Sequence, residues 1–217
     1  MKALPLAARV YVCAIIGLGA GLLVTFFPTH FLGSGWLFFT LLLLSSITSV
    51  FKVNLPLARR SSTMSVSYAV DFASLLMLGP DETMLVAAAS AFSQCNLRSK
   101  NRNPIYRTLF SMSSLIVTVQ GAGLAFHLLG GREGGGMGAE ALARPLVGAA
   151  TAYFILNTGF IATAIALTSR ERESIAGVWN ANFLWSAPSY FVGAGAAAIA
   201  AAIMDRAGYW LAPAPTK

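Results

Sequence analysis

The chain has 217 residues, of which 56% are hydrophobic and only 11% are charged, and its mean hydropathy is +0.68. Soluble domains carry roughly 25% charged residues, so this composition excludes a soluble globular protein and favours an all-α, polytopic membrane protein. The net charge of +7 does not indicate nucleic acid, because membrane proteins gather Lys and Arg in cytoplasmic loops. We expect the lipid bilayer, and no nucleic acid, as a partner.

Seven apolar segments are expected to form one transmembrane helical bundle, and residues 1–217 are expected to be a single integral membrane domain. The expected helices are Val10–Phe27, Gly35–Phe51, Met64–Leu78, Thr83–Gln94, Thr108–Leu129, Pro145–Thr168 and Asn182–Met204. The first segment is longer than the apolar part of a secretory signal peptide and lacks a cleavage site, so we interpret it as a retained helix. Pro145 is expected in the first turn of the sixth helix.

The basic residues predict the orientation of this bundle. With a cytoplasmic N-terminus and seven crossings, four basic residues lie outside, at Arg132, Arg144, Arg206 and Lys217. The other eleven lie inside, and they are Lys2, Arg9, Lys52, Arg59, Arg60, Arg98, Lys100, Arg102, Arg107, Arg170 and Arg172. The positive-inside rule therefore predicts a multi-pass protein of the bacterial inner membrane with the N-terminus in the cytoplasm and the C-terminus outside.

The third and fourth segments form a short helical hairpin at 64–95. Met64–Leu78 covers about 22 Å and Thr83–Gln94 about 18 Å, against a bilayer core of about 30 Å. The hairpin is therefore either re-entrant or a pair of spans extended by their polar flanks. We favour spanning, because a re-entrant turn would bury the charges of Asp81 and Glu82 in the membrane.

Asp71 is an acid inside the short third segment, and helical spacing places Ser67 and Ser74 on its face, with Tyr68 at the edge. One hypothesis makes Asp71 a ligand, ion or proton site, since intramembrane acids are often functional. The alternative is a hydrogen-bonded Asp that ties helices together through Ser, Tyr or Gln. The sequence leaves both open.

Other helices carry polar faces that could meet this one. The fourth segment has a stripe of Thr83, Ala87, Ser90 and Gln94, and Asn157 in the sixth is expected to make an interhelical hydrogen bond. The start of the seventh segment places several polar and aromatic residues on one face, beside the helix-loosening Pro188. These residues are Asn182, Trp185, Ser186, Ser189 and Tyr190.

Small residues in Gly17-x-x-x-Gly21 and in Gly193–Ile203 predict close helix approach, within the chain or between copies. Cys13 and Cys95 form neither a metal-binding spacing nor a disulfide framework. No catalytic motif is present, so we expect no enzymatic activity, no metal and no cofactor.

Three stretches resemble a known family. They are SVSYAVDFASLLMLGP (65–80), NLRSKNRNPIYRTLF (96–110) and AYFILNTGFIATAIALTSRERESIAGVWNANFLWSAPSYFVGAG (152–195). Together they resemble the multi-helix membrane region at the N-terminus of bacterial HD-GYP and GGDEF signalling proteins. The layout is also similar to S components of energy-coupling-factor transporters. Both resemblances imply a helical bundle with a central pocket for a small molecule. Such signalling proteins continue into a cytoplasmic domain, whereas this chain's tail is expected outside.

We therefore expect a non-enzymatic membrane protein that binds or transports a small molecule in a pocket between the short hairpin and the last two helices. The residues expected to line it are Asp71, Ser67, Gln94, Asn157, Asn182, Trp185 and Tyr190. The alternative is a sensory or accessory subunit that docks on a partner membrane protein, or on its own copies, through small-residue helices. Its polar groups would then satisfy each other and leave no cavity.

Overall fold

The computed structural model describes most of the chain, namely residues 4–28, 35–50, 52–54, 63–65, 67–96, 104–132, 138–169 and 174–207. The helices in chain order are α1 (Leu6–Thr25), α2 (Gly35–Val50), α3 (Ser67–Leu78), α4 (Pro80–Asn96), α5 (Ile105–Leu128), α6 (Ala139–Thr168), α7 (Ile175–Asn182), the 3₁₀ turn η1 (Leu184–Ser186) and α8 (Ala187–Ala207). Two three-residue strands, β1 (Lys52–Asn54) and β2 (Thr63–Ser65), pair antiparallel between α2 and α3. The expected helical bundle is confirmed.

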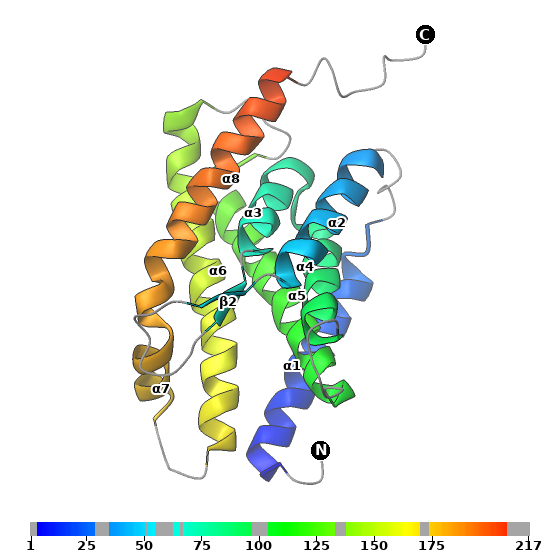
Figure 1. Cartoon of the computed structure of the whole chain (residues 1–217), viewed down its shortest axis with the longest axis vertical. Helices are drawn as coiled ribbons and strands as arrows, with labels where there is room; N and C mark the ends of the chain where they lie inside the picture. Colours follow the sequence, from blue (N-terminus) through cyan, green and yellow to red (C-terminus); the bar gives the residue numbers. More distant parts are fainter. Residues whose placement is uncertain are drawn as a thin grey trace.

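The helices form one bundle in which α5 packs against α1, α4 and α6, while α3 packs against α4 and α8. Figure 1 shows that α1 begins and α8 ends at opposite ends of the bundle. It also shows α3 alongside only part of the length of α6 and α8, with the strand pair near the middle of these long helices. Whether the hairpin spans the bilayer stays a prediction.

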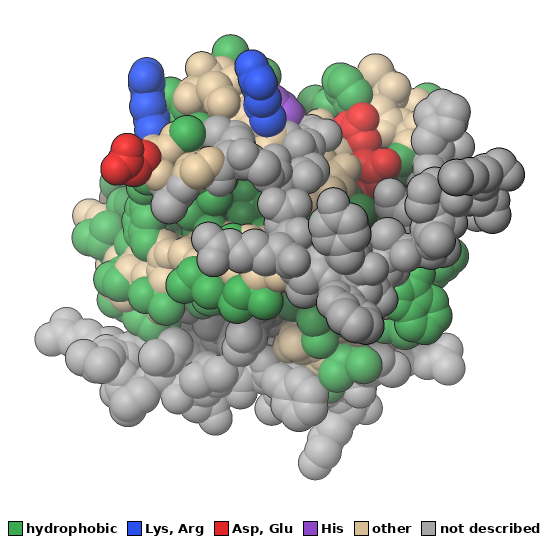
Figure 2. All heavy atoms as spheres, turned by 90° about the horizontal axis from the view of Figure 1, so that it is seen from above, with side chains coloured by type: hydrophobic (Ala, Val, Ile, Leu, Met, Phe, Trp, Pro, Cys, Tyr) green, Lys and Arg blue, Asp and Glu red, His purple; other side chains and the backbone are tan. Residues whose placement is uncertain are grey.

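Polarity in the bundle follows the pattern of a membrane protein. Among the described residues, α1, α5, α6 and the stretch Leu184–Met204 are long and apolar enough to cross a bilayer, whereas α2 and α3 are apolar but shorter. Large apolar side chains such as Val24 and Trp36 are exposed, while Ser45 and Thr118 are fully buried. Figure 2 looks onto the end where α5 meets α6 and shows acidic and basic side chains there.

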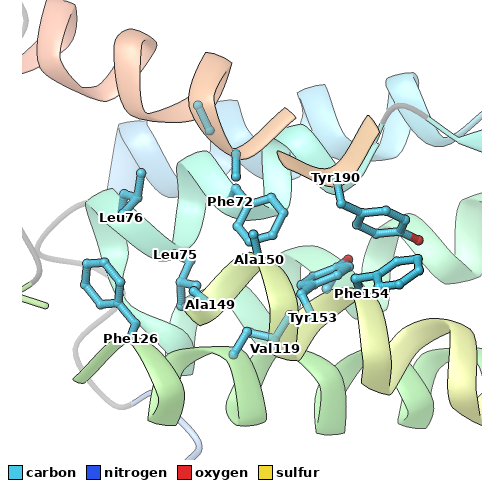
Figure 3. Close-up of a cluster of buried hydrophobic side chains, with 14 of the residues drawn as sticks. Phe72, Leu75, Leu76, Val119, Phe126, Ala149, Ala150, Tyr153, Phe154 and Tyr190 are labelled. Atoms are coloured by element: carbon cyan, nitrogen blue, oxygen red, sulfur yellow. The ribbon is translucent and has the colours of Figure 1, made fainter. Parts of the chain in front are cut away.

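The buried core runs along α3, α5, α6 and α8. Figure 3 shows Phe126 and Leu76 at one end of this cluster and Tyr153, Phe154 and Tyr190 at the other. The Phe126 end is apolar, whereas the tyrosine end carries hydroxyl groups. The tyrosine end therefore marks the part of the core where polar chemistry is available.

The predicted seventh helix was wrong at its start, because the chain forms α7, η1 and α8 in place of one helix from Asn182. Pro188 has no N–H to donate to the Leu184 carbonyl, so an uninterrupted α-helix is disfavoured there. The Ala187 N–H donates to that carbonyl in a tighter 3₁₀ bond instead. The resulting elbow places Trp185 and Ser186 of η1 at the inside of the bundle, whereas Leu184 is exposed.

Other predicted helix starts were also wrong. Met64 lies in β2 opposite Val53, so α3 begins only at Ser67. Pro145 lies inside α6, which starts at Ala139, because the preceding Ala- and Leu-rich stretch favours helix and Glu140 suits the first turn. α4 starts at Pro80 rather than Thr83, so Asp81 and Glu82 lie in its first turn.

Glycines allow close packing at several places between helices. A Cβ at Gly193 would overlap the ring of Tyr68, and one at Gly19 would overlap Ser113. By contrast, Gly17 and Gly21 have no described neighbour within 4 Å, so they do not mediate the approach of helices within this chain. The prediction of close packing is confirmed for Gly193, whereas for Gly17 and Gly21 packing between copies stays a prediction.

Candidate functional site

A cavity of about 260 Å³ lies where α3, α4, α5, α6, η1 and α8 meet; we call it the central cavity. Its lining residues are Ser67, Tyr68, Ala91, Gln94, Phe110, Ser111, Ser114, Leu115, Tyr153, Asn157, Thr158, Ile161, Asn182, Phe183, Trp185, Ser186 and Tyr190. The residues from α5 come from its first eleven positions, so the cavity lies in the half of the bundle where α5 begins.

The structure brings together six of the seven predicted site residues around this cavity. They are Ser67, Gln94, Asn157, Asn182, Trp185 and Tyr190. These residues come from six different elements, and only the fold brings them to one place. The stripe on α4 also faces inward, since Thr83, Ala87 and Ser90 are buried.

Asp71 is the predicted residue that does not line the cavity. Its Oδ1 accepts a hydrogen bond from the Ser45 hydroxyl at 3.1 Å, and its Oδ2 accepts one from the Tyr153 hydroxyl at 2.7 Å. Ser45 belongs to α2 and Tyr153 to α6, so this fully buried carboxyl group links three helices. These contacts match the helix-tying hypothesis, and they place Asp71 one side chain away from the cavity, behind Tyr153.

Tyr190 is the aromatic residue around which the cavity wall is organised. Its hydroxyl oxygen accepts a hydrogen bond from the Asn157 Nδ2 at 2.9 Å, which joins α8 to α6 as expected for Asn157. Its ring packs against Tyr68 at 4.8 Å, Phe154 at 5.2 Å and Tyr153 at 5.9 Å between centroids. Figure 3 shows Tyr153, Phe154 and Tyr190 grouped at one end of the core.

Tyr68 fixes α3 against the start of α8. Its hydroxyl donates to the Ser189 carbonyl at 3.0 Å, and its ring fills the space over Gly193. Because α8 follows directly after the elbow at η1, this contact holds the first turns of α8 in place. The position of the cavity wall on α8 therefore depends on α3.

The two tryptophans near the elbow hold it in shape. The Trp179 Nε1 donates to the Thr158 hydroxyl on α6 at 2.8 Å, and the Trp185 Nε1 donates to the Asn182 carbonyl at 2.8 Å. Both side chains are half-buried, so a simple membrane-surface role does not describe them. Trp185 and Asn182 thereby present their remaining surface to the cavity.

Several functional residues were missed from the sequence. Tyr153 was not singled out, although it lies four residues before Asn157 and so on the same face of α6. Ser45 was missed because nothing in α2 shows which of its hydroxyls meets Asp71. The hydroxyls of Ser114 and Thr118 donate to carbonyls of α5 itself.

A second cavity, of about 670 Å³, lies between α1, α4, α5 and α6, in the half of the bundle where α5 ends. Most of its wall is apolar. Asp81 lies at its edge and accepts a hydrogen bond from the Gln120 Nε2 at 3.0 Å. Asp81 and Glu82 are partly exposed.

The lining of the central cavity limits its chemistry. It holds hydroxyls, carboxamides and aromatic rings, and the lining residues include no acid or base. Among the residues that the structure describes, no group of three His, Cys, Asp or Glu side chains lies close enough to hold a metal ion. The site offers hydrogen bonds and aromatic surfaces to a bound molecule.

The fold and this cavity define the class as a multi-pass helical membrane domain with a small polar pocket inside its bundle. The comparison with protein families is more specific, since the MASE9 model matches residues 22–207. The chain belongs to the MASE9 family, within the MASE group of membrane-associated sensory domains found in signalling proteins. This agrees with the resemblance to signalling proteins seen in the sequence. No curated protein and no solved structure matches the chain.

Proposed function

We propose that this chain is a sensory membrane domain that detects a small molecule in the central cavity. The observation that carries the proposal is the gathering of polar side chains from six helices and the 3₁₀ turn around one internal space. A subunit that serves only as a helical scaffold would have its polar groups satisfied by each other and a closed core. The cavity favours binding, and membership of a sensory family favours detection over transport.

Ligand binding is proposed to change the position of α8 through Tyr190. A molecule that hydrogen-bonds to Asn157 or Tyr190 competes with, or strengthens, the bond between α6 and α8. Since Tyr68 holds the first turns of α8 against α3, a change at Tyr190 acts on the same part of α8. Ligand occupancy would thus bias the position of α8 relative to α6.

The cavity is proposed to be reached from the cytoplasmic side of the bacterial inner membrane. The bias of basic residues favours a cytoplasmic N-terminus, and the cavity lies in the half of the bundle where α5 begins. Thiol labelling in oriented vesicles tests this placement. A cysteine introduced at exposed Arg132 in a chain with Cys13 and Cys95 replaced should react only from the outer side, and reaction from the inner side alone would reverse the orientation.

Ligand binding is tested by thermal stabilisation of the purified chain in nanodiscs with a panel of small polar metabolites. A bound molecule raises the melting temperature because it binds only the folded state. For any compound that does so, Tyr190→Phe should reduce the shift, since the hydroxyl that faces Asn157 is lost. Tyr106→Phe, the same chemical change away from the cavity, is the control. Equal shifts in both variants would place the binding elsewhere.

A further inference from the structure

The polar atoms that line the central cavity divide into those with partners and those without. The Asn157 and Asn182 Nδ2 groups donate to Tyr190 and to the Val178 carbonyl, whereas their Oδ1 atoms accept no hydrogen bond from the described residues. The half-buried Gln94 carboxamide makes none to the described part of the chain, and the Tyr190 hydroxyl accepts without donating there. Partly buried polar groups favour a partner. A ligand that both donates and accepts hydrogen bonds fits these atoms.

The charge of the residues that line the cavity sets a second condition on the ligand. Among the described residues, no acidic or basic side chain lines the cavity, and the buried carboxyl group of Asp71, behind Tyr153, already accepts from Ser45 and Tyr153. A charged molecule loses its hydration when it enters a site of low dielectric constant. Without a counter-charge in the site, no interaction offsets this loss of hydration free energy. A neutral molecule avoids this penalty.

The aromatic side chains around the cavity set a third condition on the ligand. The rings of Tyr68, Tyr190 and Phe154 pack on one another with centroids 4.8 to 5.2 Å apart, so they do not form the open cage that a quaternary ammonium group needs. By contrast, Trp185 and Phe183 line the cavity and make no ring contact with another described aromatic side chain. Their surfaces remain available for a flat molecule to stack on.

The geometry points to a neutral, planar molecule with an amide-like edge as the ligand class of the central cavity, an inference that rests on the proposed function. In this arrangement the flat part of the molecule packs against Trp185 and Phe183. Its donor and acceptor face Gln94, Asn157 and Asn182. The cavity volume of about 260 Å³ suits a molecule of one or two rings.

Three isosteric probes test the ligand class, because benzamide, benzoate and benzamidinium share size and planarity and differ in charge. Saturation-transfer NMR on the chain in nanodiscs, with empty nanodiscs as the blank, gives the dissociation constant of each. Benzamide should bind at least tenfold more tightly than either ion. Gln94→Leu should weaken benzamide severalfold, whereas Gln120→Leu, the same change at the second cavity, should leave it unaltered.

The outcomes separate this inference from the proposed function. Tighter binding of benzoate or benzamidinium than of benzamide would overturn the ligand class and leave the cavity as a binding site. Stabilisation by some other compound of the metabolite panel, with no binding of any of the three probes, would do the same. If neither the panel nor the probes bind, both proposals are wrong.

Discussion

Two buried polar clusters lie side by side in this bundle and differ in how completely their groups are paired. In the Asp71 cluster, both carboxyl oxygens accept hydrogen bonds, from Ser45 and Tyr153, and Asp71 lines no cavity. In the Tyr190 cluster, the Asn157 Nδ2 donates one hydrogen bond to the Tyr190 hydroxyl. The other polar atoms of these two side chains face a cavity. Tyr153 belongs to both clusters, since it bonds to Asp71 and lines the cavity.

The difference teaches that an acid within the membrane does not by itself mark the site. Asp71 has the more conspicuous chemistry, but its pairing assigns it to holding α2, α3 and α6 together. The carboxamides and the tyrosine hydroxyl are less conspicuous, and they remain open to a ligand. Pairing, rather than charge, distinguishes the structural cluster from the candidate site.

The largest effect is expected from removing the Asp71 carboxyl group. Asp71→Leu leaves the buried hydroxyls of Ser45 and Tyr153 without their acceptor, at about 1–3 kcal/mol for each unpaired group. We expect the free energy of unfolding to fall by about 3 kcal/mol, measured by denaturant titration in detergent. A loss below about 1 kcal/mol would show that Asp71 does not tie the helices.

A smaller loss is expected where Tyr68 packs on α8. Gly193→Ala places a Cβ into the Tyr68 ring, and such overpacking costs about 1–3 kcal/mol. Gly195→Ala, two residues along α8, meets open space and is the matched control. The same denaturant titration compares them, and equal stability of the two variants would contradict the packing of Tyr68 on α8.

Two hydroxyl deletions compare the clusters directly. Tyr153→Phe leaves an Asp71 oxygen without its donor and should lower the free energy of unfolding by about 2 kcal/mol. Tyr190→Phe removes one bond at the edge of a cavity and should lower it by about 1 kcal/mol. If Tyr190→Phe proves the more costly, the assignment of the structural and open clusters is reversed.

The smallest effect is expected at Ser74, on the same helix as Asp71. Its hydroxyl is fully buried and has no hydrogen-bond partner, so Ser74→Ala removes an unpaired group. We expect unfolding free energy within about 0.5 kcal/mol of the parent chain, or slightly higher. A loss of more than about 1 kcal/mol would indicate that this hydroxyl is bonded.

The helical bundle and most of the site could be predicted because membrane helices show their polar faces in their spacing. Gln94, Asn157 and Tyr190 each stand out as polar groups in apolar helices, and such groups turn away from lipid. When several helices each have one polar face, only a few ways of packing them bring all of these faces together inside the bundle. For this reason the site residues were predictable without knowing the order in which the helices pack.

The role of Asp71 could not be predicted in the same way, because it depends on which partners reach it. Its partners lie 26 and 82 residues away, on helices whose rotation the sequence does not state. The elbow before α8 could not be predicted from the sequence either. Pro188 predicts a weakened helix, but the separate α7 and the 3₁₀ turn depend on packing against α6.

The most direct test of the account is the reactivity of a thiol in the cavity wall. In a chain with Cys13 and Cys95 replaced, Asn157→Cys and Ser74→Cys both place a cysteine within an apolar helix, but only the first lines the cavity. A water-soluble thiol reagent should modify the cysteine at 157 and not the one at 74, and benzamide should slow the reaction at 157. If the cysteine at 157 is as unreactive as the one at 74, the central cavity is closed to solutes and the sensory pocket is contradicted.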